Sequence, residues 1–208
     1  MSAGHVIAID GPAGAGKSTV AKAVAQRLGW SLLDTGAMYR AVTYVALTQG
    51  LSLDDESALA AVARNARIET QPHVVINGHD VSEAIRTPQV NQAVSLVATL
   101  AAVREALVEQ QRAWAQRQPK GVVVEGRDMT TVVFPSATVK IFLTADADVR
   151  QARRGEDSGD SVRRRDEIDS TRTASPLTLA PDARMVDTTD RSVEDVVEEI
   201  VSCLEPKK

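Results

Sequence analysis

The segment with the clearest chemical potential is a glycine-rich loop over residues 11–19. Its sequence fits the pattern G-x-x-x-x-G-K-[ST], which is typical of a loop that binds the phosphates of a nucleoside triphosphate. Backbone N–H groups of such a loop point at the phosphates, and the dipole of the following helix adds attraction. We expect Lys17 to reach the β- and γ-phosphates and the Ser18 hydroxyl to ligate Mg²⁺. The expected ATP-binding residues are Gly11, Pro12, Ala13, Gly14, Ala15, Gly16, Lys17, Ser18 and Thr19. The alternative is a glycine-rich turn without a ligand.

Two arginines follow short apolar runs that end in an acidic residue. Asp34 ends one run and is followed by Arg40, and Glu125 ends another and is followed by Arg127. An arginine fork can hold a phosphate in a bidentate grip, so both arginines are candidates for a second anion. The alternative is a pair of surface salt bridges. Asp34 and Glu125 could reach Mg²⁺ through water, or they could cap local N–H groups at the strand ends.

The stretch 150–173 is rich in arginine. Arg150, Arg153 and Arg154 share one expected helix face. Arg165, Asp169 and Arg172 stand at i, i+4 and i+7 and share another, which could also be no more than a solvated charged face. Since a glycine- and serine-containing link joins the two, we expect a lid that brings positive charge to the phosphates and excludes water.

The remaining pattern predicts the elements that position these residues. Apolar runs at 5–9, 31–34, 122–125, 139–143 and 185–187 read as buried strands, and helices are expected at 20–28, 37–49, 54–66, 88–117 and 193–204. Ser52 or Asp54 is the expected cap of the third helix, and Ser192 that of the last. The pair Asn77-Gly78 predicts a small antiparallel hairpin within 67–82.

Alternating strands and helices predict an α/β fold with a five-stranded parallel sheet and helices on both faces. Ligands of such sheets lie outside the carboxyl ends of the strands. That rule places four residues along one edge, namely Gly11, Asp34, Gly126 and Asp187.

Composition bounds the remaining possibilities. The 208 residues carry a net charge of −4, which argues against general binding to nucleic acid. No apolar run has membrane-spanning length, and no signal-peptide pattern precedes the first strand. Cys203 is the only cysteine, which fits a reducing compartment, and we expect it to be a buried structural thiol. We therefore expect a monomeric cytoplasmic domain over 1–208, without membrane or nucleic-acid partners.

Several segments together resemble the bacterial cytidylate kinases, a branch of the nucleoside monophosphate kinases with a phosphate-binding loop. The resemblance rests on the loop at 11–19 and on five further segments, Leu33–Arg40, Gly78–Ser82, Glu125–Met129, Thr131–Pro135 and Arg165–Leu177. It covers nearly the whole chain. It implies transfer of the γ-phosphoryl of ATP to CMP or dCMP with Mg²⁺, a monophosphate-binding insertion over 67–95 and a lid over 150–173.

The resemblance also implies roles for individual residues. The CMP site would take in Thr35, Arg40, Ser95, Arg104, Arg127, Asp128, Arg165, Asp169 and Arg172. Arg40, Arg127 and Arg172 suit the acceptor phosphate. Asp169, together with Arg165, suits the ribose. The base would be bound by Ser95, Arg104 and Asp128. The catalytic charges would be Lys17, Arg127, Arg153 and Arg154.

The chain departs from the family pattern at three places. The lid is short between Arg154 and Arg163, and Thr130 replaces a usual glycine, which would cause strain if the position requires a positive φ. Ala101 stands where proline is frequent. Because nine helical steps would put Ser95 and Arg104 on nearly opposite faces, we predict a helix break near Thr99–Ala101 with Thr99 as the N-cap of the second helix.

Two other functions remain open at this point. The chain could be a kinase for another acceptor, such as UMP or a small metabolite. It could also be a non-catalytic nucleotide switch, although the guanine-reading segment Asn-Lys-x-Asp is absent from the sequence. An ATP-binding protein without an acceptor would leave Arg40 and Arg127 without a role.

Overall fold

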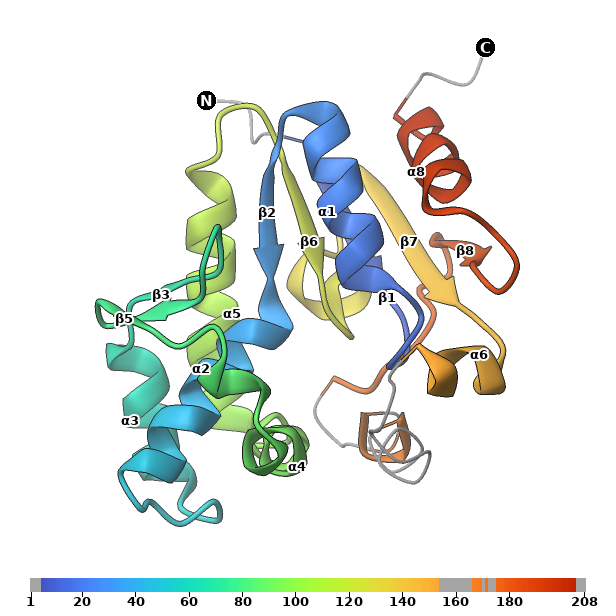
Figure 1. Cartoon of the computed structure of the whole chain (residues 1–208). Helices are drawn as coiled ribbons and strands as arrows, with labels where there is room; N and C mark the ends of the chain where they lie inside the picture. The colour runs from blue at the N-terminus through green and yellow to red at the C-terminus, as the bar shows by residue number, and fades with distance from the viewer. Residues whose placement is uncertain (1–4, 154–165, 170, 172–174, 205–208) are drawn as a thin grey trace.

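A parallel sheet of five strands forms the centre of the protein (Figure 1). The computed structural model describes residues 5–153, 166–169, 171 and 175–204. The strand order is β2–β6–β1–β7–β8, and the bounds are β1 (Val6–Asp10), β2 (Ser31–Asp34), β6 (Val122–Glu125), β7 (Val139–Thr144) and β8 (Arg184–Asp187). Asp34 pairs with Glu125 and Thr144 with Asp187, so the carboxyl ends share one edge. The predicted parallel sheet is confirmed, with strand bounds that agree with the prediction to within one residue.

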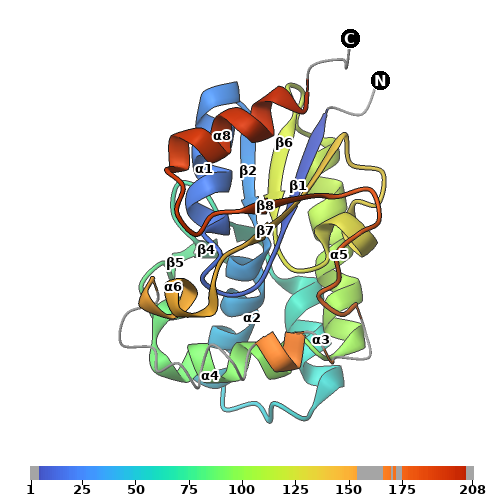
Figure 2. The ribbon, with the colours of Figure 1, turned by 90° about the vertical axis from the view of Figure 1, so that its right-hand side faces the viewer.

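Helices cover both faces of this sheet, which explains why its central strands are apolar on both sides (Figures 1 and 2). They are α1 (Lys17–Leu28), α2 (Thr35–Thr48), α3 (Glu56–Asn65), α4 (Pro88–Val97), α5 (Ala101–Gln116), α6 (Ala147–Ala152) and α8 (Val193–Ser202), with a 3-10 turn η1 (Ala84–Arg86) and a π-helical turn η2 (Met129–Val133). Ile7 and Ile9 of β1 pack with α1 and α8, whereas Ala8 faces α2, α3 and α5. No helix in the described part of the chain is long and apolar enough to cross a membrane.

A second, antiparallel sheet lies beside α2 and is made of β3 (Ile68–Glu69), β4 (Val75–Ile76) and β5 (His79–Asp80). Asn77 and Gly78 connect β4 to β5 with φ angles of 51° and 83°. Two consecutive positive φ angles match the tight hairpin turn that favours Asn-Gly. The predicted hairpin is therefore confirmed.

The caps of two helices test the sequence prediction in opposite ways. The Ser192 hydroxyl accepts a hydrogen bond from Asp195 N at 3.1 Å and begins α8 as predicted. The prediction for α3 is wrong, since the cap is Asp55, whose carboxylate accepts from Ala58 N at 2.9 Å. Asp55 is the residue directly before the helix, and its side chain reaches the amide three positions on.

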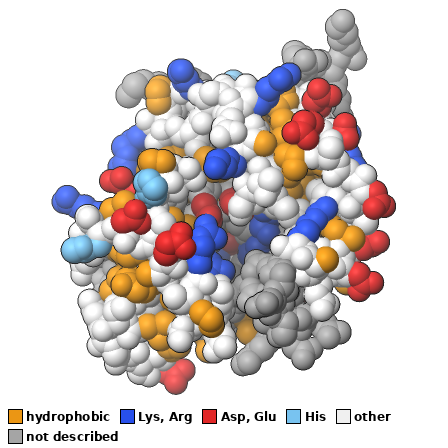
Figure 3. All heavy atoms as spheres, viewed as in Figure 1, with side chains coloured by type: hydrophobic (Ala, Val, Ile, Leu, Met, Phe, Trp, Pro, Cys, Tyr) orange, Lys and Arg blue, Asp and Glu red, His pale blue; other side chains and the backbone are white. Residues whose placement is uncertain are grey.

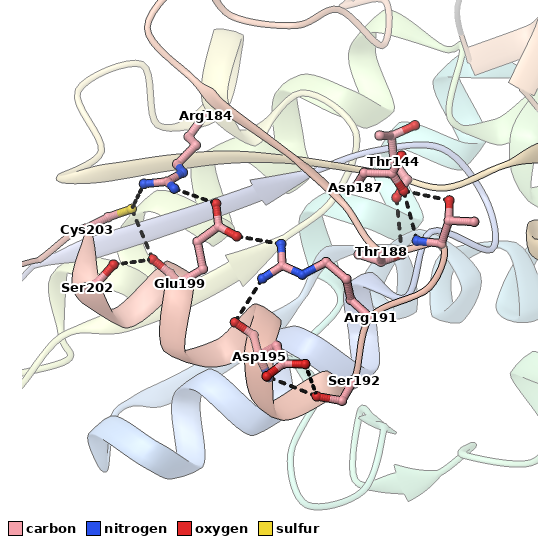
Figure 4. A network of polar contacts seen from close by, with 11 residues as sticks. Thr144, Arg184, Asp187, Thr188, Arg191, Ser192, Asp195, Glu199, Ser202 and Cys203 are labelled. Carbon is pink, nitrogen blue, oxygen red and sulfur yellow. Dashed lines mark hydrogen bonds and ion pairs between the residues drawn. The ribbon is translucent and has the colours of Figure 1, made fainter.

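Cys203 lies in a polar network at the C-terminal end of α8 (Figure 4). The two oxygens of Glu199 contact Arg184 at 2.6 Å and Arg191 at 2.5 Å. The Cys203 thiol donates to the Glu199 carbonyl at 3.3 Å, and Arg184 Nη1 lies 3.7 Å from the sulfur. The prediction of a buried thiol holds only in part, because Cys203 is the C-cap residue of α8 and is half-buried, although it packs against the hydrophobic core.

Candidate active site

The glycine-rich loop connects β1 to α1 at the carboxyl edge of the sheet. Gly16 is the N-cap of α1, with a φ of 85° and no side-chain cap, which leaves the first amides of the helix available to an anion. Gly14 has a φ of 79°, and a Cβ there would lie 2.5 Å from the Arg150 carbonyl oxygen. Only glycine therefore fits this close approach between the loop and α6.

A cavity opens beside this loop, and we refer to it as the donor cavity. It is lined by Gly14, Gly16, Lys17, Ser18, Thr19, Val20, Arg153, Thr188, Arg191, Ser192, Val193 and Val196. Lys17 is 7% exposed, and its Nζ donates to the Pro12 carbonyl at 2.7 Å. The Lys17 ammonium is thus held above the glycine-rich loop, which directly precedes α1.

Arg153, predicted from the lid, lines the donor cavity. Its guanidinium donates to the Thr188 hydroxyl at 2.8 Å and to the Thr188 carbonyl at 2.6 Å. Thr188 follows β8, and its hydroxyl lies 3.1 Å from the Thr144 carbonyl oxygen and 3.2 Å from that of Ala15. Arg153 is therefore fixed between the phosphate loop and the end of the sheet, while Arg154 lies outside the described residues.

Asp166 forms a contact that the sequence did not predict. Its carboxylate accepts from Ala13 N at 3.0 Å and pairs with Arg150. Arg150 also donates to the Ala13 carbonyl at 3.1 Å. One carboxylate and one guanidinium thus bind both polar groups of the same loop residue and connect two parts of the predicted lid segment, at 150 and 166, to the loop.

A second cavity, which we refer to as the acceptor cavity, lies on the other side of Glu125. It is lined by Thr35, Gly36, Tyr39, Arg40, Val94, Ser95, Ala98, Arg104, Gly126, Arg127, Asp128 and Asp169. Seven of the nine residues predicted for the CMP site line it; the other two, Arg165 and Arg172, lie outside the described residues. In the view of Figure 3, a hollow lies near the centre of the molecule, where acidic and basic side chains meet.

One end of the acceptor cavity is formed by a buried ion pair. Arg104 of α5 and Asp128, which follows β6, are 4% and 3% exposed, and their side chains bind one another. The Arg104 guanidinium also lies 5.7 Å from the centroid of the Tyr39 ring. A fixed donor and a fixed acceptor side by side can recognise the hydrogen-bonding edge of a planar base.

The other end of the acceptor cavity carries two arginines in defined positions. Arg40 donates to the Asn91 side chain at 2.5 Å and to the Ile85 carbonyl at 3.0 Å. Arg127 donates from Nε to Asp169 at 2.7 Å. Although burial opposes the charged form, the Asp169 carboxylate raises the pKa of Arg127 above its ordinary value. A guanidinium group stays cationic in proteins, as binding of a phosphate dianion requires.

The helix break between Ser95 and Arg104 is confirmed, because α4 ends at Val97 and α5 begins at Ala101. The prediction of Thr99 as N-cap is wrong. Its hydroxyl donates backwards to the Leu96 carbonyl at 2.7 Å, and Leu100 takes the N-cap position without a side-chain bond.

A residue of another helix stabilises the start of α5. Glu56 of α3 accepts from Ala102 N at 2.7 Å, which satisfies one of the free amides of the first turn. This contact accounts for a break in a stretch without proline or glycine. The break between α4 and α5 brings Ser95 and Arg104 to the same cavity.

Glu125 lies between the two cavities and is almost fully buried, at 4% exposure. Burial raises its pKa from 4.5 to about 7, and the nearby Asp34 carboxylate adds to this. Lys17 and the Ser18 hydroxyl lower it by a smaller amount. Its Oε1 makes no hydrogen bond to the described residues. An orphaned buried carboxylate oxygen beside the Ser18 hydroxyl fits a site for a hydrated cation.

Asp34 shows the capping role that was the alternative to metal binding. One of its oxygens accepts from Ala37 N at 2.9 Å and begins α2. The described residues contain no group of three or more acidic, histidine or cysteine side chains that could hold a metal ion.

Asp10 is a buried residue beside the phosphate loop whose contacts the sequence did not reveal. It is the last residue of β1, is 0% exposed, and accepts hydrogen bonds from Met129 N at 2.8 Å and Thr130 N at 2.7 Å. The Thr130 hydroxyl adds a third bond at 2.7 Å. The strain considered for Thr130 is absent, since the non-glycine residues with positive φ in the described part of the chain are Asn77 and Ser175.

Comparison with known proteins decides the family. The model of the cytidylate kinase family matches residues 7–206. The chain belongs to the cytidylate kinase family. Cytidylate kinases of Geobacillus kaustophilus and Azotobacter vinelandii are 49% and 44% identical to it, over 94% and 95% of this chain and 94% and 93% of theirs. A bifunctional pantoate ligase/cytidylate kinase of Trichormus variabilis is 49% identical over 94% of this chain, which spans 40% of that longer protein.

Solved structures support the fold of this family member. An uncharacterized protein from Eubacterium ventriosum superposes with a TM-score of 0.53 at 14% identity, over 98% of this chain and 99% of the other. The protein TT1252 from Thermus thermophilus gives 0.50 at 17% identity and the same coverage. At these identities the likeness concerns the fold alone, and the family assignment makes the chain a nucleotide-binding kinase.

Proposed function

We propose that this cytidylate kinase family member transfers the γ-phosphoryl of ATP to CMP or dCMP, giving ADP and CDP or dCDP. The observation that carries the proposal is the acceptor cavity. It combines an Arg104–Asp128 pair at one end with Arg40 and Arg127 at the other, next to a phosphate-binding loop. The names of the close relatives agree with this reaction.

In the proposed complex, ATP lies in the donor cavity with its phosphates on residues 11–19. CMP lies in the acceptor cavity with its phosphate between Arg40 and Arg127, joined by Arg172. Asp169 and Arg165 face the ribose, and Thr35 closes the cavity where α2 begins. We assign 67–95 to a monophosphate-binding insertion and 150–173 to a lid that includes Arg153 and Arg154.

The base end explains a choice of cytosine. The amino group at position 4 of cytosine donates a hydrogen bond, whereas uracil has a carbonyl acceptor there. Asp128 can accept from the amino group, while Arg104 and Ser95 can donate to the adjacent acceptors of the ring. Uracil would set its carbonyl against the Asp128 carboxylate, and a buried unpaired acceptor is costly.

Phosphoryl transfer needs positioning and neutralisation of charge more than covalent chemistry. The acceptor phosphate is largely a dianion at neutral pH, so its oxygen attacks without a general base. Holding it in line by Arg40 and Arg127 can lower the barrier by about 7–11 kcal/mol in well-oriented cases. Lys17, Arg127 and the two lid arginines neutralise charge on the transferred group.

Mg²⁺ would be held by the Ser18 hydroxyl, with Glu125 and the remaining oxygen of Asp34 acting through bound water. When bound, the ion neutralises charge on the ATP phosphates. The orphaned oxygen of Glu125 supports this placement.

A coupled assay of ADP formation with ATP, Mg²⁺ and a panel of nucleoside monophosphates tests the proposal. We expect kcat/KM for CMP to exceed that for UMP by about 10⁴-fold, as in sites that hydrogen-bond a distinguishing group. Comparable values for CMP and UMP would show that the Arg104–Asp128 pair does not read the base. Failure of every acceptor would favour a non-catalytic nucleotide-binding protein.

A further inference from the structure

Asp10 and Thr130 form a buried contact between the start of the phosphate loop and the acceptor cavity. Asp10 immediately precedes the loop, and Thr130 belongs to η2, which follows Asp128. The two residues are 0% and 1% exposed. A carboxylate without access to water is costly unless hydrogen bonds satisfy it, and here three donors do so.

The first of these bonds acts on Asp128. Met129 N belongs to the same peptide unit as the Asp128 carbonyl, and it donates to Asp10 at 2.8 Å. The Asp128 carbonyl accepts from Val132 N at 2.9 Å and from Val133 N at 3.1 Å. Both sides of this peptide are therefore fixed, which sets the direction in which the Asp128 side chain leaves the backbone.

The Thr130 hydroxyl is the only one of the three donors to Asp10 that comes from a side chain. Burial raises the pKa of Asp10 above its ordinary value, and the hydroxyl bond of Thr130 is the strongest effect that opposes this. The bond therefore favours the ionised carboxylate, in which both oxygens accept from the backbone amides of η2.

We infer that Asp10 and Thr130 are a positioning pair that aligns Asp128 with the phosphate loop, so that one buried carboxylate sets the base-recognition group relative to ATP. This inference rests on the proposed function, because it assigns the aligned group to the CMP base. Neither residue lines the acceptor cavity, so both act through Asp128 and do not touch the substrate.

The adjacent threonine supplies a matched control. Thr131 lies in the same π-helical turn, and its buried hydroxyl makes no hydrogen bond to the described residues. Thr130→Val and Thr131→Val thus make the same chemical change at neighbouring positions, but only the first removes a bond to Asp10. Thr130→Ser keeps the hydroxyl, and Thr130→Ala removes it without placing a methyl group near the carboxylate.

The experiment measures kcat, KM for CMP, KM for ATP and the melting temperature of the full chain and these four variants. We expect Thr130→Val and Thr130→Ala to raise KM for CMP by about tenfold, the effect of losing one hydrogen bond of ordinary strength. We expect KM for ATP to change less than about twofold in every variant, since the loop keeps its own backbone contacts. Thr130→Ser and Thr131→Val should both retain the original KM for CMP.

Three outcomes would overturn the inference while leaving the proposed function intact. They are unchanged kinetics in both Thr130→Val and Thr130→Ala, an equal rise of KM for both substrates, and failure of Thr130→Ser to restore KM for CMP. A lower melting temperature with unchanged kinetics would show that the contact is only structural. If the unmodified protein does not phosphorylate CMP, the proposed function fails first, and the inference fails with it.

Discussion

The donor and acceptor cavities are built by different means. The donor cavity takes its loop amides and Lys17 from one continuous segment, and Arg153 with side chains between 188 and 196 completes its lining. The acceptor cavity takes side chains from α2, α4, α5, the turn after β6 and Asp169. Several of its polar groups bind one another, as in the pairs Arg104–Asp128 and Arg127–Asp169.

This difference has a consequence for recognition. Backbone amides and one lysine recognise phosphate, which every nucleoside triphosphate carries, so the donor side is general. The acceptor side holds arginines and carboxylates in ion pairs with one another, and such fixed polar groups let a site discriminate between similar bases. We therefore expect changes in the two cavities to affect the two substrates separately.

The largest effects should come from Lys17→Met and Arg127→Met. We expect Lys17→Met to lower kcat by about 10³-fold, because it removes a cation from the transferred phosphoryl group, and to leave CMP binding intact.

Arg127→Met should lower kcat/KM for CMP by about 10²-fold with an unchanged KM for ATP, since it removes a guanidinium group that binds the CMP phosphate. Steady-state kinetics and calorimetric titration with CMP alone measure both effects.

Matched controls exist for both substitutions. Lys22→Met changes an exposed lysine on the same helix, and Arg27→Met an exposed arginine near its end. Neither should alter the kinetics by more than about twofold, because screened surface charges contribute little. If Arg127→Met raised KM for ATP as much as KM for CMP, the two cavities would not act on the two substrates separately.

A smaller effect concerns Glu125 between the cavities. Its folded pKa of about 7 exceeds the ordinary 4.5, so the folded protein holds this proton more tightly than the unfolded chain. This contribution to stability is full below pH 4.5 and is lost as the pH rises through 7, a change of about 3 kcal/mol. Thermal unfolding without nucleotide or Mg²⁺ should show this loss, and Glu125→Gln should greatly reduce it.

Asp10 also has a raised pKa and changes stability in the same direction. Because Asp10 is present in both the unmodified protein and Glu125→Gln, its effect cancels when the two are compared. Glu105→Gln, at an exposed position of α5, serves as the control. Identical pH dependence of Glu125→Gln and the unmodified protein would show that Glu125 is not the group that titrates.

The smallest expected effect is at Glu56, which caps α5 from α3. Glu56→Ala removes the bond to Ala102 N, and losing such a cap costs about 1 kcal/mol. We expect the melting temperature to fall by about 2–4 °C and KM for CMP to rise slightly, because Arg104 lies in the first turn of this helix. Glu109→Ala on the exposed side of α5 should change neither quantity, whereas an equal effect of both substitutions would contradict the cap.

The same contrast explains what the sequence could predict. The strand–loop–helix arrangement around residues 11–19, the parallel sheet and the Asn77-Gly78 turn follow from local patterns, and all three are confirmed. Arg40 and Arg127 follow from their positions after two strand ends, whereas the prediction of Ser95, Arg104 and Asp128 rests on a family resemblance, because no spacing rule connects these three. Their shared cavity depends on how α4, α5 and the turn after β6 pack.

Asp10 and Glu56, two residues that the sequence did not reveal, share one physical property, which is that their partners are distant in the chain. Glu56 contacts a residue 46 positions away, and Asp10 one 120 positions away. Each is a single acidic residue without a local pattern, so only the fold reveals its partner. Thr99 shows the converse: a favourable cap type was present, but its hydroxyl bonds backwards to Leu96.

A crystal structure with CMP and a non-hydrolysable ATP analogue would test the central assignment most directly. We expect the cytosine amino group within hydrogen-bond distance of Asp128, the CMP phosphate between Arg40 and Arg127, and the triphosphate on residues 11–19. A CMP molecule seated on the glycine-rich loop, or a base bound away from Arg104 and Asp128, would contradict it.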